Sequence, residues 1–137
     1  MSDLSAFLEA RISEDEASAK AAASVAGPHW RHDTGWSKAD HPYSQVRSPG
    51  GAIVADALRG PDDEEIGPFL ARHDPARILR EAAAMRQIAA HMTAPRTTAS
   101  LDGLIVNGRF RTTGDHALRL LAAIWRDHPD YEEAWKP

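Results

Sequence analysis

One amphipathic stretch constrains the fold of this chain more than any other feature. Between Pro75 and Met92, apolar side chains recur at alternating steps of four and three residues, the period of one face of an α-helix. The members of this stripe are Ile78, Ala82, Met85, Ala89 and Met92, and Leu79 and Ile88 widen it. A stripe of this width faces a protein core, so the sequence predicts a central helix over Pro75–Met92.

Further helices are predicted on both sides of the central one. They are Asp3–Ser24, a helix that opens at Pro61, one around Leu118–Trp125, and a final helical turn over Tyr131–Trp135. Leu4, Phe7, Leu8 and Ile12 share one face of the first helix, and beyond them that face is only alanine. In the helix after Pro61 the apolar stripe is Ile66, Phe69 and Leu70.

Two segments predict antiparallel strands. Tyr43–Arg47 and Ala52–Ala55 flank Ser48-Pro49-Gly50-Gly51, where proline and glycine at the central positions suit a type II turn. Leu104–Arg111 predicts a hairpin around Asn107-Gly108, the preferred pair of a type I′ turn. The predicted fold class is therefore α+β: mainly helical, with about four helices and a small antiparallel sheet or hairpin.

The size and composition of the chain bound its class. A chain of 137 residues predicts a single domain over 1–137. With no cysteine, it has no disulfide, no Cys-ligated zinc or iron–sulfur site and no thiol nucleophile. No run approaches the roughly 18 apolar residues of a membrane span, and the acidic start lacks the basic and apolar blocks of a secretory signal. We therefore expect a cytoplasmic protein without membrane contact.

No catalytic signature is present in the sequence. It has no G-x-S-x-G elbow, no P-loop and no G-x-G-x-x-G. His73-Asp74 and Asp127-His128 each place a carboxylate beside an imidazole, but both pairs fall at predicted helix boundaries, where Asp caps and Pro follows. We expect a protein that is not an enzyme and needs no cofactor.

Histidines supply the one metal hypothesis. His29-x-x-His32 with His41 has the short spacing of a ligand set, and zinc requires three or four converging ligands. On an extended strand positions i and i+3 point to opposite faces, so a polar loop with solvated histidines is the simpler interpretation.

Charge is unevenly distributed along the chain. The net charge is −4, with the acids concentrated in Asp56–Glu65, whereas Ala71–Arg96 is locally positive. The candidate residues for contact with a protein partner or with nucleic acid phosphates are Arg77, Arg80, Arg86, Arg109 and Arg111. The alternative is that these arginines pair internally and solvate an ordinary helix face.

Aromatic residues allow a further interpretation. Trp30, Trp36, Trp125, Tyr131 and Trp135 would suit a ligand pocket, but such residues far more often close small cores. We expect Trp125 and Trp135 to clamp the C-terminal turn.

Three stretches carry a resemblance to a known family. They are Leu4–Glu16, His73–Glu81 (HDPARILRE) with Met85–Ile88, and Leu118–Pro137, which contains DHPDYEEAW. Together they resemble a family of short proteins from actinobacteria and their phages, catalogued as a domain of unknown function. The high ratio of arginine to lysine, 13 to 3, agrees with a high-GC source. The resemblance implies no established activity and no catalytic residue.

These features favour a non-enzymatic binding or regulatory protein of phage or high-GC actinobacterial origin, acting through protein–protein contacts. The alternatives are a nucleic-acid-binding protein that uses the basic helix edge and hairpin, and a small metalloprotein with His29, His32 and His41 as ligands. The stripe of Ile78, Ala82, Met85 and Ala89 would also serve a homodimer.

Overall fold

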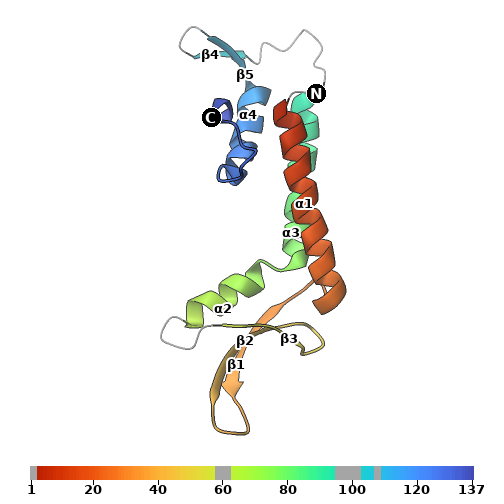
Figure 1. Cartoon of the computed structure of the whole chain (residues 1–137), viewed down its shortest axis with the longest axis vertical. Coiled ribbons are helices and arrows are strands. Elements are labelled where there is room, and N and C mark those ends of the chain that lie inside the picture. The colour runs from red at the N-terminus through yellow and green to blue at the C-terminus, as the bar shows by residue number, and fades with distance from the viewer. Residues whose placement is uncertain (1–2, 58–62, 95–102, 107–108) are drawn as a thin grey trace. The chain divides into compact units, whose positions relative to one another are not determined.

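The computed structural model describes residues 3–57, 63–94, 103–106 and 109–137. Within them the chain forms four α-helices, two antiparallel sheets and two short 3-10 helices, which confirms the predicted α+β class (Figure 1). In chain order the elements are α1 (Asp3–Ala26), β1 (Arg31–Trp36), β2 (Pro42–Arg47), β3 (Ile53–Asp56), α2 (Asp63–Arg72), α3 (Pro75–Thr93), β4 (Gly103–Val106), β5 (Arg109–Thr112), α4 (Thr113–Ala122), η1 (Ala123–Trp125) and η2 (Glu133–Trp135).

The chain divides into two compact units. The terminal unit comprises Met1–Glu14 with Ala82–Pro137, and the middle unit is Asp15–Glu81.

The core of the terminal unit forms around the first turns of α1. The ring of Phe7 lies 4.9 Å from that of Trp135 and 6.0 Å from that of Tyr131, centroid to centroid. The buried cluster consists of Leu4, Phe7, Leu8, Leu118, Ala122 and Trp135. The predicted apolar face of the first helix and the return of the C-terminal turn onto the body are both confirmed.

The hairpin of the terminal unit has the predicted register. β4 and β5 pair antiparallel, with Ile105 opposite Phe110 and Val106 opposite Arg109. Asn107-Gly108, the predicted turn, lies outside the described residues.

The middle unit is built on a three-stranded antiparallel sheet of order β1-β2-β3. Along β2, Ser44 and Val46 are buried on one face, and α2 approaches this face at Gly67. A Cβ on Gly67 would come within 2.2 Å of the imidazole of His32, whose Nε2 lies 2.9 Å from Oγ of Ser44. The absence of a side chain at Gly67 therefore lets α2 come this close to β1.

The opposite face of the sheet carries a network around Arg47. Its guanidinium donates to the Gly51 carbonyl at 2.8 Å, lies 3.3 Å from the Asp33 carboxylate, and sits 5.5 Å from the centroid of the Tyr43 ring. Arg47 thus connects β1, β2 and the turn that follows β2.

Three details differ from the prediction. Gly51, at φ +85°, and not Gly50 holds the left-handed conformation, so the turn after β2 is not type II. The Gly51 amide donates to the Ser48 carbonyl at 2.9 Å, as in a type I turn followed by a left-handed residue. This turn matches the twist of the flanking strands better than a type II turn does. The polar segment Arg31–Trp36 forms a strand. Phe69, which belongs to the predicted apolar stripe of α2, is 60% exposed.

Within the part of the chain that the structure describes, no helix has the length and apolar character needed to cross a membrane.

Candidate functional site

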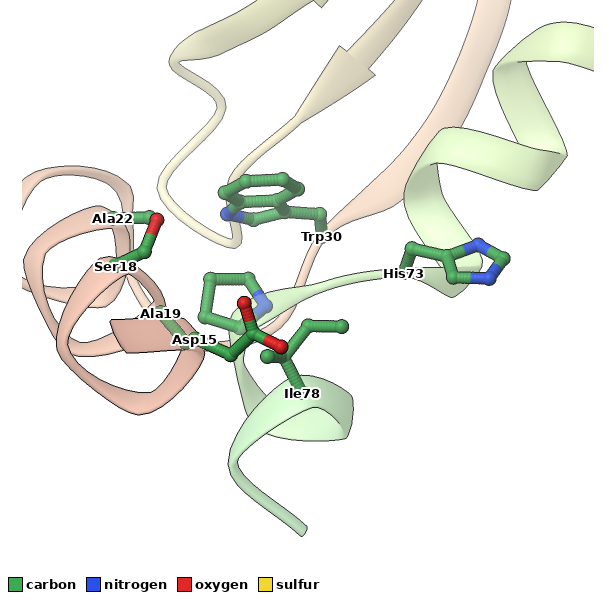
Figure 2. Close-up of a pocket in the computed structure, with 8 residues that line it drawn as sticks. Asp15, Ser18, Ala19, Ala22, Trp30, His73 and Ile78 are labelled. Carbon is green, nitrogen blue, oxygen red and sulfur yellow. The ribbon is translucent and has the colours of Figure 1, made fainter. Parts of the chain in front are cut away.

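A pocket of about 320 Å³ opens in the middle unit where the end of α1 meets the start of α3. We call it the Trp30 pocket; its lining residues are Asp15, Ser18, Ala19, Ala22, Trp30, His73, Pro75 and Ile78. Figure 2 shows the Trp30 indole over the hollow and the Asp15 carboxylate below it, turned toward Ile78. The imidazole of His73 is turned away from the other labelled residues.

The α1 wall of the pocket is a stripe of small residues. Asp15, Ser18, Ala19 and Ala22 follow the spacing i, i+3, i+4 and i+7, so they share one face of the helix. Ala19 is buried and Ala22 half-buried. Because these side chains are short, they leave an open volume that leucine at the same positions would occupy.

The opposite wall is fixed by the junction before α3. Asp74 caps the helix, since its Oδ1 accepts from the Arg77 amide at 2.8 Å, and Pro75 occupies the first helical position, as predicted. The Ala76 amide donates to the Pro28 carbonyl at 2.9 Å, which ties α3 to the loop after α1. The HDPARILRE stretch therefore builds one side of the pocket.

Trp30 is held in position by its own polar atom. Its Nε1 donates to the Gly27 carbonyl at 3.1 Å, and Gly27 ends α1 with φ +77°. The indole is half-buried, so part of the ring remains available to a ligand. Trp30 is one of the five aromatic residues that would suit a pocket, and none of the other four lines this one.

The polar groups of the pocket are not arranged for nucleophilic catalysis. His73 Nδ1 lies 2.8 Å from the Phe69 carbonyl oxygen, and its ring centroid is 4.3 Å from that of Phe69. Among the described residues no hydrogen bond joins Ser18 to a histidine, so the hydroxyl has no adjacent base.

A larger hollow of about 540 Å³ in the terminal unit is lined mainly by charged and polar residues near the C-terminal turn: Ala123, Arg126, Asp127, Tyr131, Glu133, Lys136 and Pro137. Lys136 is in contact with Glu133, and Arg126 lies 3.9 Å from Asp127. Since its charges pair locally, this hollow offers no charge preference to a ligand.

The predicted basic residues are divided between the two units. Arg77 and Arg80 belong to the middle unit, whereas Arg86, Arg109 and Arg111 belong to the terminal unit. Arg77 Nε lies 2.6 Å from Glu81, and Arg86 Nε lies 3.2 Å from Glu9. The side chains of Arg109 and Arg111, on β5, lie outside the described residues.

The predicted histidine ligands serve separate contacts. His29 Nδ1 lies 3.5 Å from Asp74 Oδ2, His32 contacts Ser44, and the amide of His41 donates to Ser37 Oγ at 3.2 Å. Within the described ranges no three His, Asp or Glu side chains converge as a metal would require.

The two Asp–His neighbours act as boundary residues. Asp74 caps α3, and its carboxylate meets His29 and not the adjacent His73. His128 contacts Arg11 and lies 3.9 Å from Asp130, not against Asp127.

Comparison with known proteins gives a family without an activity. The family model that matches residues 1–137 is described as a family of unknown function (DUF6221). Neither a curated protein nor a solved structure matches the chain.

Proposed function

The chain belongs to this family of unknown function (DUF6221), and from its own residues we propose that it is a non-enzymatic binding protein that acts through contact with another protein. The Trp30 pocket is the contact site in this proposal. The observation that carries it is a hollow of about 320 Å³ with an anchored indole and small or apolar walls, which suits a side chain from a partner.

Exposed apolar surface beside the pocket supports the proposal. His73, which lines the pocket, packs its ring on Phe69, and Phe69 is 60% exposed. Val25, one turn beyond Ala22 on α1, is 88% exposed. Protein interfaces commonly combine a pocket for one anchoring side chain with apolar surface around it.

Nucleic acid binding is the weaker alternative. Two of the arginines proposed for phosphate contact, Arg77 and Arg86, lie within ion-pair distance of Glu81 and Glu9. Each pairing reduces the positive potential available to phosphates. Of the other candidates, Arg80 is exposed on α3, and the side chains of Arg109 and Arg111 lie outside the described residues.

The sequence carries the rest of the proposal. Its resemblance to proteins of actinobacteria and their phages, together with its arginine-rich composition, supports such an origin. Such an origin would place the protein in the cytoplasm of a bacterium or of a phage-infected cell.

Site-directed photo-crosslinking in a high-GC host tests the proposed function. A photoreactive amino acid replaces Ser18, an exposed residue on the pocket rim, and Ser24, an exposed residue on the same helix outside the pocket, is the matched control. We expect a discrete protein adduct from position 18 and none from position 24. Equal adducts from both positions, or none from position 18 in folded protein, would contradict the proposal. An adduct removed by nuclease would instead favour the nucleic-acid alternative.

A further inference from the structure

We propose that β1 pairs edge to edge with β1 of a second copy of this chain, so that the sheets of two middle units join into one. This surface is distinct from the Trp30 pocket, and the inference does not depend on the proposed function.

The β1–β2 ladder shows which backbone groups of β1 point away from β2. The Ser37 amide donates to the His41 carbonyl at 2.8 Å, at the end of this ladder. Hydrogen-bonded pairs alternate with non-bonded pairs along an antiparallel ladder, so the N–H and C=O groups of every second residue face outward. These residues are His32, Thr34 and Trp36.

The β2–β3 ladder agrees with this assignment. The Ala57 amide donates to the Ser44 carbonyl at 2.9 Å, so the backbone of Ser44 faces β3 and that of the next residue, Gln45, faces β1. Gln45 lies opposite Asp33. Asp33 therefore bonds toward β2, and Thr34 is left facing outward.

The outer edge of β1 is open within the described part of the chain. No strand and no loop backbone there pairs with the outward groups, and Trp36 is 69% exposed. The six residues of β1 include neither lysine nor proline and pair with β2 without a bulge, features that commonly protect sheet edges. β3, at the other edge, has four residues and a register shift. β1 is therefore the edge better suited to accept a further strand.

This edge is complementary to itself. The outward residues are evenly spaced, so an antiparallel pair centred on Thr34 sets Thr34 opposite Thr34 and His32 opposite Trp36 of the second copy. Every outward N–H and C=O group then has a backbone partner. A contact of this kind uses the same surface on both copies, as in a two-fold symmetric dimer.

Charge favours the register centred on Thr34. It sets Asp33 opposite Gly35 of the second copy, whereas a register centred on Asp33 would set two carboxylates directly opposite each other, which is destabilising. Each Asp33 carboxylate also lies 3.3 Å from Arg47 of its own chain. The pairing therefore brings no like charges directly opposite each other.

The exposed indole of Trp36 gains a neighbour in this register. Trp36 and His32 lie on the same face of β1, because side chains two or four residues apart along a strand share a face. Across the proposed contact, each Trp36 lies beside the His32 ring of the other copy, and aromatic cross-strand pairs stabilise sheets. A second copy thus satisfies the backbone, charge and aromatic groups of the edge together.

Amide hydrogen exchange of the full chain at two concentrations tests the pairing. A contact along one strand edge is small, so we expect Kd on the order of 100 μM. Between about 10 μM and about 1 mM chain, the amides of His32, Thr34 and Trp36 should then exchange about fourfold more slowly. The amides of Asp33 and Gly35, which already face β2, should not change.

Two lysine variants identify the edge. Thr34→Lys places two ammonium groups opposite each other at the centre of the contact, and Ile53→Lys places the same side chain on β3, where Ile53 is 53% exposed. We expect Thr34→Lys to weaken dimerisation about tenfold or more and Ile53→Lys to change it less than about twofold, as measured by sedimentation equilibrium. Equal unfolding midpoints confirm that both variants are folded.

Three results would overturn the inference. They are a chain that stays monomeric up to about 1 mM, a dimer that leaves the exchange of the three outward amides unchanged, and equal weakening by the two lysine variants. None of them bears on the position-18 adduct, so the proposed function is tested separately.

Discussion

The guanidinium of Arg11 lies against the imidazole of His128, where its Nη1 contacts both ring nitrogens, across 117 positions of sequence. Arg11 is 7% exposed, also donates to Glu14 at 2.8 Å, and sits 5.5 Å from the centroid of the Phe7 ring. Two of the stretches that carry the family resemblance, the opening helix and the DHPDYEEAW ending, therefore meet in the terminal unit.

Replacing Arg11 by methionine tests how much this contact stabilises the chain. The variant keeps an apolar stem on Phe7 but removes the donors to His128 and Glu14, so we expect a loss of about 1–3 kcal/mol in the free energy of unfolding. Glu14→Gln is the control: its side chain is 62% exposed, and it should cost less than about 1 kcal/mol. Urea unfolding measures the loss of stability in both variants. Equal losses would show that Arg11 contributes no more to stability than an exposed ion pair does.

Tryptophan substitutions separate core from surface. Trp135 is 8% exposed and packs on Phe7, so Trp135→Ala should cost about 3–5 kcal/mol and leave the terminal unit partly unfolded. Trp36 is 69% exposed, and Trp36→Ala should cost less than about 1 kcal/mol. Circular dichroism during thermal unfolding compares them; a larger loss from Trp36→Ala would contradict the described core.

A double variant probes the contact of α2 with the sheet. Gly67→Ala places a methyl group against the His32 ring, so we expect it to destabilise the chain by about 1–3 kcal/mol despite the better helix propensity of alanine. Adding His32→Ala should recover part of this loss, because the ring that blocks the methyl is gone. A double-mutant cycle measures the coupling, and strict additivity would argue against the close approach.

Neighbouring glycines test the corrected turn. Gly51 has φ +85°, and Gly51→Ala should cost about 1–2 kcal/mol. Gly50 does not have a positive φ, and a Cβ there would meet Ser48 Oγ at 3.9 Å, ordinary contact. Gly50→Ala should therefore be neutral or stabilise by about 0.4–1 kcal/mol. Chemical denaturation of both proteins decides between the turn types, because a type II turn would reverse the order.

Periodicity predicted the helices because burial of an apolar face is a strong local signal. Leu4, Phe7, Leu8 and Ile12 repeat at the helical period, and all four are buried. β1 was harder to predict because its sequence, RHDTGW, is polar, and its pairing with β2 is made by backbone hydrogen bonds that a side-chain pattern does not show. The prediction of a type II turn was wrong because the proline–glycine pattern carries no information on the twist of the flanking strands.

The Trp30 pocket was only partly accessible from sequence. The spacing of Asp15, Ser18, Ala19 and Ala22 was a usable signal of a small-residue face, but alanine contributes too little burial to stand out in a hydrophobic pattern. The assignment of Trp30 to this face depends on the fold of the loop after α1. The five basic residues were candidates on their charge alone, and two of them lie at ion-pair distance from an acid. Glu81 is four residues from Arg77, so the sequence spacing indicates that pair. Glu9 is 77 residues from Arg86, so the sequence does not indicate the other pair.

The most direct measurement compares Ala22→Leu with Ala21→Leu for binding to the protein captured at position 18. Both variants add the same side chain to α1, but Ala22 lines the Trp30 pocket and Ala21 is exposed outside it. We expect Ala22→Leu to weaken the affinity by about tenfold or more and Ala21→Leu to leave it unchanged, with equal unfolding midpoints for the two variants. Unchanged affinity in Ala22→Leu, or equal loss in both variants, would contradict the Trp30 pocket as the contact site.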